Sequence, residues 1–142
     1  MEDAFWDSSA LVPLYVTQRS TQQVEGLSRK FQVTVWWSTP VEIRSAFARL
    51  ARMGQLTSNG QVQAQFELDQ LRRVWREVQP SEALREQAER LVDRFPLKAA
   101  DAQQLAAAIT WCVGRPMGRA FISSDSQLLD AARQLGFEAI EA

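Results

Sequence analysis

The stretch that decides the fold is Val33-Thr34-Val35-Trp36-Trp37, which is followed after one serine by Thr39-Pro40-Val41-Glu42. The β-branched and aromatic residues of its first part predict a strand. The second part predicts that a helix begins at once, with Thr39 as N-cap, proline at the first position and Glu42 at the third. A strand that leads directly into a helix is typical of a parallel α/β fold, and the acid then falls near the carboxyl end of the strand.

Three further acids stand at or near comparable junctions. Asp7 ends the apolar run Ala4-Phe5-Trp6, and Asp125 follows an apolar run that ends at Ser123. Asp101 lies in the first turns of an Ala-rich helix predicted over residues 99–113. Because parallel strands end at the same edge of a sheet, we expect Asp7, Glu42, Asp101 and Asp125 to lie close together there.

Hydrophobic periodicity predicts the remaining elements. We predict strands over residues 4–7, 33–37, 120–123 and 137–140, and helices over residues 11–16, 21–31, 39–53, 58–77, 81–95, 99–113 and 124–135. Strands separated by helices indicate an α/β fold whose parallel sheet is covered on both faces. The helices between Trp37 and Ala120 predict a helical hairpin insertion and a crossover helix.

The composition limits the class of protein. The chain has 142 residues, of which 46% are hydrophobic, so we expect one globular domain over residues 1–142. Cys112 is the only cysteine, which excludes an intrachain disulfide and gives no sign of an oxidising compartment. We see no signal peptide and no apolar run long enough to span a bilayer, and therefore expect a soluble, cytoplasmic protein without a membrane role. The net charge of −1 gives no direct argument for nucleic acid.

The absence of histidine decides which chemistry is open to this chain. It has no Ser–His pair, no zinc-type cysteine cluster and no Gly-rich phosphate loop, so any catalysis must use carboxylates. Carboxylates brought close together repel one another unless a hard divalent cation neutralises them, and oxygen ligands suit Mg²⁺ or Mn²⁺. Such a site activates water and stabilises the leaving oxygen of a phosphodiester.

Each acid also has a structural alternative. Glu42 completes a capping box, Asp101 lies where the helix dipole favours an acid, and Asp125 competes with Ser124 for an N-cap. Asp7 has the weakest alternative, because it ends a buried strand where an unpaired carboxylate is costly. Taken together, the four acids favour a common site over four separate caps.

Four motifs that contain these acids occur in order along nearly the whole chain. They are Phe5-Trp6-Asp7-Ser8-Ser9-Ala10-Leu11, Ser38-Thr39-Pro40-Val41-Glu42, Leu97-Lys98-Ala99-Ala100-Asp101 and Phe121-Ile122-Ser123-Ser124-Asp125. The set resembles the motifs of PIN-domain ribonucleases, in particular the VapC-type toxins of bacterial toxin–antitoxin modules. In this resemblance Asp7, Glu42, Asp101 and Asp125 match the metal-binding acids, and Ser9 matches a supporting hydroxyl. Family members often carry His at the position of Gln104 and Lys at that of Pro13, neither of which is a metal ligand.

The resemblance implies a three-layer α/β/α PIN-like fold with a central parallel sheet of four to five strands. It also implies an endoribonuclease that depends on Mg²⁺ or Mn²⁺, with Asp7, Glu42, Asp101 and Asp125 as its catalytic and metal-binding residues. Hydrolysis would leave a 5′-phosphate and a 3′-hydroxyl. The implied partners are an RNA substrate, a second copy of the chain in a homodimer, and a cognate antitoxin.

Two other classes compete with this hypothesis. One is a catalytically silent PIN fold that serves as an RNA- or protein-binding module. The other is a phosphate-handling α/β protein, either an Asp-nucleophile phosphatase or a response-regulator receiver. The phosphatase pattern needs an Asp where Ser9 stands, and the receiver pattern needs a late lysine, whereas the last lysine is Lys98. Both of these patterns therefore fit poorly.

Some side chains carry open alternatives. Side chains alternate along a strand, so Trp36 and Trp37 are predicted to face opposite sides of a covered sheet and both to be buried. Arg72, Arg73 and Arg76 would form either a solvated helix face or a phosphate or antitoxin contact. Arg44 and Arg49 follow Glu42 on its helix, and Arg44 would contact either a substrate phosphate or a surface acid.

Overall fold

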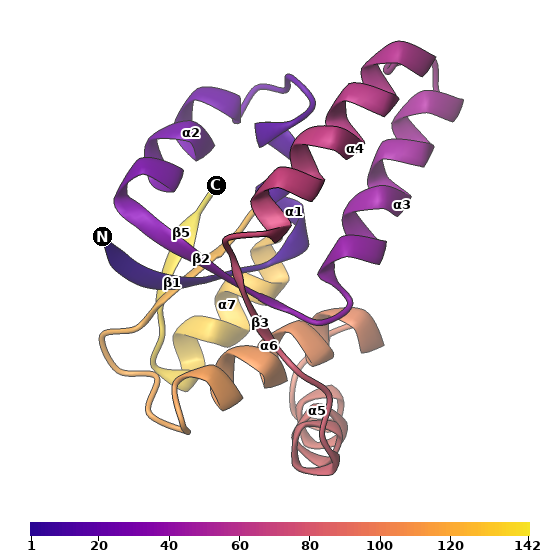
Figure 1. Cartoon of the computed structure of the whole chain (residues 1–142). Coiled ribbons are helices and arrows are strands. Elements are labelled where there is room, and N and C mark those ends of the chain that lie inside the picture. The colour runs from indigo at the N-terminus through magenta and orange to yellow at the C-terminus, as the bar shows by residue number, and fades with distance from the viewer.

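A computed structural model describes residues 1–142 (Figure 1). Strands alternate with helices for most of its length. In chain order the elements are β1 (Glu2–Trp6), α1 (Ser8–Leu11), the 3₁₀ helix η1 (Val12–Leu14), α2 (Thr21–Lys30), β2 (Phe31–Trp36), α3 (Thr39–Arg52), α4 (Ser58–Arg72), β3 (Arg76–Val78), α5 (Glu82–Arg94), α6 (Ala99–Trp111), β4 (Ala120–Ser123), α7 (Ser126–Leu135) and β5 (Glu138–Glu141).

The five strands form one sheet in the order β3-β2-β1-β4-β5, and every neighbouring pair is parallel. The predicted parallel sheet of four to five strands is therefore confirmed. The chain winds outward from β1 to β3 on one side and then continues with β4 and β5 on the other. The strand order reverses between β1 and β4, and the carboxyl ends at such a reversal leave a crevice where α/β proteins bind ligands.

Two hydrophobic cores cover the two faces of the sheet, as the alternation of side chains along β1 requires. Ala4 and Trp6 point to one face, where they pack with α2, α3 and α4. Phe5 points to the other face, where it stacks on Phe121 with ring centroids 5.7 Å apart and packs with α5, α6 and α7. The three-layer α/β/α arrangement is thus built from strands that are apolar on both sides.

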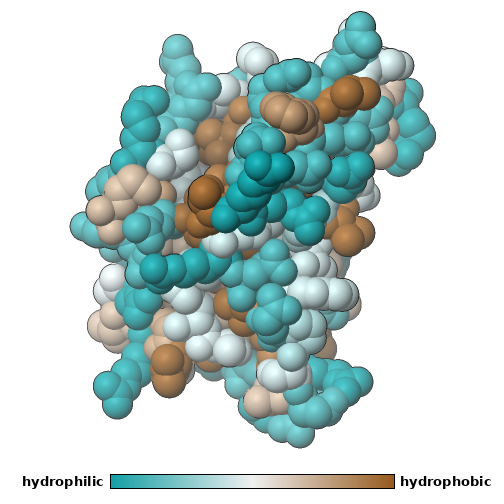
Figure 2. Space-filling model, viewed as in Figure 1, coloured by the Kyte–Doolittle hydropathy of each residue, from teal (hydrophilic) through white to brown (hydrophobic).

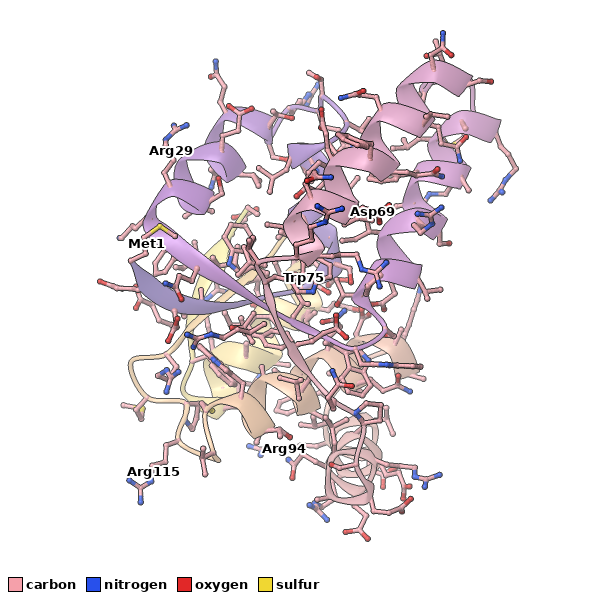
Figure 3. The ribbon with its side chains drawn as sticks, viewed as in Figure 1. Met1, Arg29, Asp69, Trp75, Arg94 and Arg115 are labelled. Atoms are coloured by element: carbon pink, nitrogen blue, oxygen red, sulfur yellow. The ribbon has the colours of Figure 1, made fainter.

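The predicted helical hairpin is formed by α3 and α4, which extend beyond the rest of the molecule in Figure 1. The predicted helix over residues 58–77 is wrong at its end, because α4 stops at Arg72 and residues 76–78 form the edge strand β3. Parallel pairing of β3 with the open edge of β2 replaces the last helical turn. Trp75, labelled in Figure 3, lies between the end of α4 and the start of β3. It is buried and donates its indole Nε1–H to Glu77 Oε2 at 3.0 Å.

The prediction that Trp36 and Trp37 are both buried is half wrong. Trp36 is buried on the α6 face, but β2 ends there, and Trp37 lies just beyond it with 52% of its surface exposed. Arg76 lies on β3 and not on a helix, where it forms an exposed ion pair with Asp3 at 3.8 Å. The predicted helical cluster of three arginines therefore does not form.

The exposed surface is mixed in character. On the face shown in Figure 2, hydrophilic residues cover most of the area and hydrophobic residues form separate small patches. None of the helices combines the length and the apolar character that crossing a membrane requires.

Candidate functional site

All four predicted acids line one cavity, which has a volume of about 280 Å³. The cavity lies at the carboxyl edge of the sheet, beside the reversal between β1 and β4. Asp7 directly follows β1, Asp125 follows β4, and the first turns of α3 and α6 supply Glu42 and Asp101. The prediction that Asp7, Glu42, Asp101 and Asp125 lie together is confirmed by this common lining.

Asp7 is buried, with 5% of its surface exposed, although it carries a carboxylate. It stands at the N-cap position of α1, but its side chain caps nothing. Its Oδ2 instead accepts hydrogen bonds from Ser9 Oγ at 2.5 Å and Ser123 Oγ at 2.8 Å. Burial raises the pKa of Asp7, and these two hydroxyls offset part of that rise, while the charges of Glu42 and Asp125 add to it.

The same two hydroxyls tie the end of β4 to Asp7. Ser9 Oγ accepts a hydrogen bond from the backbone N–H of Ser124 at 3.1 Å, and Ser123 Oγ accepts one from the backbone N–H of Asp125 at 3.0 Å. Each hydroxyl therefore accepts from the chain beyond β4 and donates to Asp7. Ser9 and Ser123 therefore both contact Asp7, and they fix the segment that carries Asp125 beside it.

Glu42 lies in the first turn of α3, but it does not complete the predicted capping box. The helix begins at Thr39, with Ser38 at the N-cap position and no side-chain cap. Glu42 Oε2 instead accepts hydrogen bonds from Ser8 Oγ at 2.7 Å and Gln104 Nε2 at 2.5 Å. Burial raises the pKa of Glu42, these two donors lower it, and the charge of Asp101 raises it further.

Gln104 is a fully buried amide that faces this network. Its Nε2 also lies 2.7 Å from Ser8 Oγ and 3.3 Å from Thr39 Oγ1, while its Oε1 is buried without any hydrogen-bond partner. Exchanging the amide oxygen and nitrogen would place Oε1 against the carboxylate of Glu42, which cannot donate when ionised. The unpartnered oxygen is costly, and such conflicts are concentrated at functional sites.

Asp101 and Asp125 complete the acidic wall of the cavity. Burial raises the pKa of Asp101 to about 6, the charges of Asp7 and Asp125 contribute to the rise, and Lys98 opposes it. Asp125 is the N-cap of α7, with Oδ1 accepting from the backbone N–H of Leu128 at 3.1 Å. Of the two N-cap candidates that the sequence left open, Asp125 and not Ser124 caps α7, and the same residue lines the cavity.

No basic side chain forms an ion pair with these acids. The ion pairs of the structure join Arg72 to Asp69, Arg76 to Asp3, Arg85 to Glu82 and Arg133 to Asp130, and none involves the four acids of the cavity. The basic residue in the cavity lining is Arg49 and not Arg44, whose position the sequence left open. Acids that raise one another's pKa and lack a cationic partner are typical of a functional site.

The donor set fits a hard divalent cation. Four carboxylates with no nitrogen or sulfur ligand suit Mg²⁺ or Mn²⁺, and a bound cation would offset the burial and repulsion that raise the pKa values of Asp7, Glu42 and Asp101. The side chains as they stand, however, include no group of three or more that could hold a metal ion. Hydrogen bonds occupy Asp7 Oδ2 and Glu42 Oε2. Asp7 Oδ1 and Glu42 Oε1 accept none of these hydrogen bonds and are the oxygens that would bind a cation.

The sequence did not assign roles to three polar residues of this site. From the sequence, Ser8 is identified only as part of the first motif, Ser123 as the end of a strand, and Gln104 as a departure from the family pattern. Ser123 lies on the buried strand β4, where a hydroxyl needs a hydrogen-bond partner. This requirement could have indicated that Ser123 contacts another polar residue of the site. Ser8 and Gln104 meet across 96 positions of sequence, so no local pattern predicts their contact.

No family model matches the sequence, and no curated protein matches it. Among solved structures, the chain is similar to VapBC2 from Rickettsia felis bound to a DNA fragment from their promoter, with a TM-score of 0.67 and 10% identity over 98% of each chain. It is also similar to a toxin–antitoxin complex from Klebsiella pneumoniae, with a TM-score of 0.58 and 16% identity over 87% of this chain and 88% of that chain. At these identities the similarity establishes the fold, and it confirms the PIN-like α/β/α fold that the sequence predicts.

Proposed function

We propose that this chain is a metal-dependent endoribonuclease of the VapC type and acts as the toxin of a toxin–antitoxin pair. The observation that carries the proposal is the convergence of Asp7, Glu42, Asp101 and Asp125 on one cavity with no cationic partner. The fold that the chain shares with two toxin–antitoxin structures supports the toxin role. A cognate antitoxin and a homodimer belong to the same proposal.

The four acids would hold Mg²⁺ or Mn²⁺. When bound, the cation would supply water activation and neutralise charge that develops on the phosphodiester. The hydroxyls of Ser9 and Ser123 both donate to Asp7 Oδ2, which fixes the plane of the carboxylate and leaves Oδ1 without a hydrogen bond. Ser8 and Gln104 act on Glu42 in the same way, through Oε2.

The reaction would be hydrolysis of an RNA phosphodiester. The water oxygen forms a bond to phosphorus, the bond between phosphorus and the 3′ oxygen breaks, and a proton is transferred to that 3′ oxygen. The products are a 5′-phosphate and a 3′-hydroxyl. The chain contains no histidine for the proton transfers, so acidic residues and water must serve them.

One observation favours a second function, that of a catalytically silent binding module with the same fold. In their present arrangement the acids include no group of three or more that could hold a metal ion. Hydrogen bonds from Ser9 and Gln104 already occupy one carboxylate oxygen of Asp7 and one of Glu42. Binding of RNA that persists without metal, together with no cleavage, would support this function.

The deciding experiment is incubation of purified protein with total bacterial RNA, in Mn²⁺ or Mg²⁺ and in EDTA. Discrete fragments with 5′-phosphates that form only with metal are the expected result. Intact RNA in the presence of folded protein and metal would favour the silent module. Growth arrest on expression, relieved by the antitoxin, would test the toxin role separately.

A further inference from the structure

The cavity contains a single basic residue, Arg49, whose guanidinium has no partner. Arg49 lines the cavity together with the four acids, it is exposed, and it forms none of the ion pairs in the structure. A cation that served to balance the acids would lie against one of them. The side chain of Arg49 therefore remains available for an anion that enters the cavity.

The position of Arg49 on α3 places it at a defined distance from the acids. Residues 42 and 49 lie on nearly the same face of the helix, separated by about 10 Å along its axis. Ala46 and Leu50 lie on this face as well and also line the cavity, without charge. The cavity thus runs from an acidic end at Glu42, past an uncharged stretch, to a cationic end.

This separation suits a polyanion that spans both ends. The acidic end would repel a phosphate unless a divalent cation bridges the two, whereas Arg49 binds a phosphate directly and in bidentate geometry. The rise of about 10 Å between residues 42 and 49 places the backbone of Arg49 about two turns beyond Glu42. A strand whose scissile phosphate lies at the acids would therefore bring a neighbouring phosphate toward Arg49.

We infer that Arg49 binds a phosphate of the RNA next to the scissile one and so sets where the strand lies in the cavity. This inference rests on the proposed nuclease function. Arg49 is then a substrate-binding residue, so its replacement should raise KM and change kcat little.

The test is steady-state cleavage of a short single-stranded RNA in Mn²⁺ by wild type, Arg49→Gln, Arg49→Lys and Arg44→Gln. Arg44 is a matched control, because it is an exposed arginine on the same helix that does not line the cavity. Arg49→Gln should lower kcat/KM by about ten- to a hundredfold, the value of a hydrogen bond to a charged group. The dependence of log kcat/KM on log salt should also lose about 0.7 in slope, as one single-strand phosphate contact predicts. Arg49→Lys should keep the slope, and Arg44→Gln should behave like wild type.

A second probe locates the contact on the RNA. Neutral methylphosphonate linkages are placed one at a time on either side of the cleaved bond. At one flanking position, the neutral linkage should lower the kcat/KM of the wild type and leave that of Arg49→Gln unchanged. Equal effects of Arg49→Gln and Arg44→Gln, with active wild type, would overturn the role of Arg49 and leave the nuclease proposal standing. Absence of any RNA cleavage by the wild type would overturn both.

Discussion

The molecule has two neighbouring cavities that share helix α6 and differ in chemistry. The first turn of α6 gives Asp101 to the acidic cavity, while Ala99, Ala102 and Gln103 line a groove between α5 and the end of β2. That groove has a volume of about 640 Å³, against about 280 Å³ for the acidic cavity, and its walls include Trp36 and Trp37. The larger space is mainly apolar, and the smaller one holds every acid with a raised pKa.

The two cavities differ in position as well as in volume and chemistry. The acidic cavity lies where the strand order reverses, so side chains from four segments meet there. The groove lies beside the sheet, where α5 and α6 pack, and none of the acids with a raised pKa lines it. Convergent groups whose protonation is perturbed mark the site of chemistry.

The largest effect is expected from Asp7→Asn, which tests whether the acidic cavity is the site of RNA cleavage. We expect RNA cleavage to fall by about a thousandfold or more, because a carboxylate that acts at the reacting atoms is removed. Asp69→Asn is the matched control, since Asp69, labelled in Figure 3, is a half-exposed acid on α4 that does not line the cavity. Equal cleavage by wild type and Asp7→Asn would mean that another nuclease is responsible.

Gln104→Leu tests whether the buried amide supports the acidic cavity. Loss of its hydrogen bonds to Glu42 and Ser8 should lower the free energy of unfolding by about 1–3 kcal/mol, measured by denaturant unfolding in EDTA. Gln103→Leu, at the exposed neighbouring position, should change it by less than about 0.5 kcal/mol. An unchanged stability of Gln104→Leu would show that the unpartnered Oε1 already cancels the benefit of the amide.

Asp101→Asn should raise the stability of the protein while it lowers RNA cleavage. The pKa of Asp101 is about 6 in the folded chain and 3.8 in the reference state, so the folded state holds more protons between these values. Wild-type stability must therefore fall as pH rises through this window, and the Asn variant should lose that part of the decline. At neutral pH in EDTA, the variant should unfold at a higher temperature than wild type. In Mn²⁺ it should cleave RNA more slowly than wild type. Parallel pH profiles of the two proteins would contradict this.

The smallest effect is expected in the apolar groove. Trp37→Ala should leave the cleavage rate within about twofold, because Trp37 is half exposed and lies outside the acidic cavity. Val92→Ala on α5 serves as a second substitution in the same groove. A large rise in KM for Trp37→Ala alone would show that RNA bases stack there, and the separation between the two cavities would no longer hold.

Local patterns predicted the elements whose signals were strong. The strand Ala120–Ser123 and the end of α7 at Gly136 are where the sequence placed them, the latter because a left-handed cap with φ of 104° favours glycine. The strand β3 was missed because residues 76–78 become a strand only by pairing with β2. Trp37 was misplaced because the alternation of β2 ends one residue earlier than its composition suggests.

The sequence by itself determined the order of strands and helices apart from β3, the chemistry open to a chain without histidine, and the four acids at their junctions. Only the tertiary structure decided which hydroxyls hold those acids, that Gln104 reaches Glu42, and that Arg49 and not Arg44 lines the cavity. The physical reason is that periodicity and capping act over a few residues, whereas a site is made by side chains from distant segments. Their contacts depend on how the strands are ordered and how far each helix turns before it meets them.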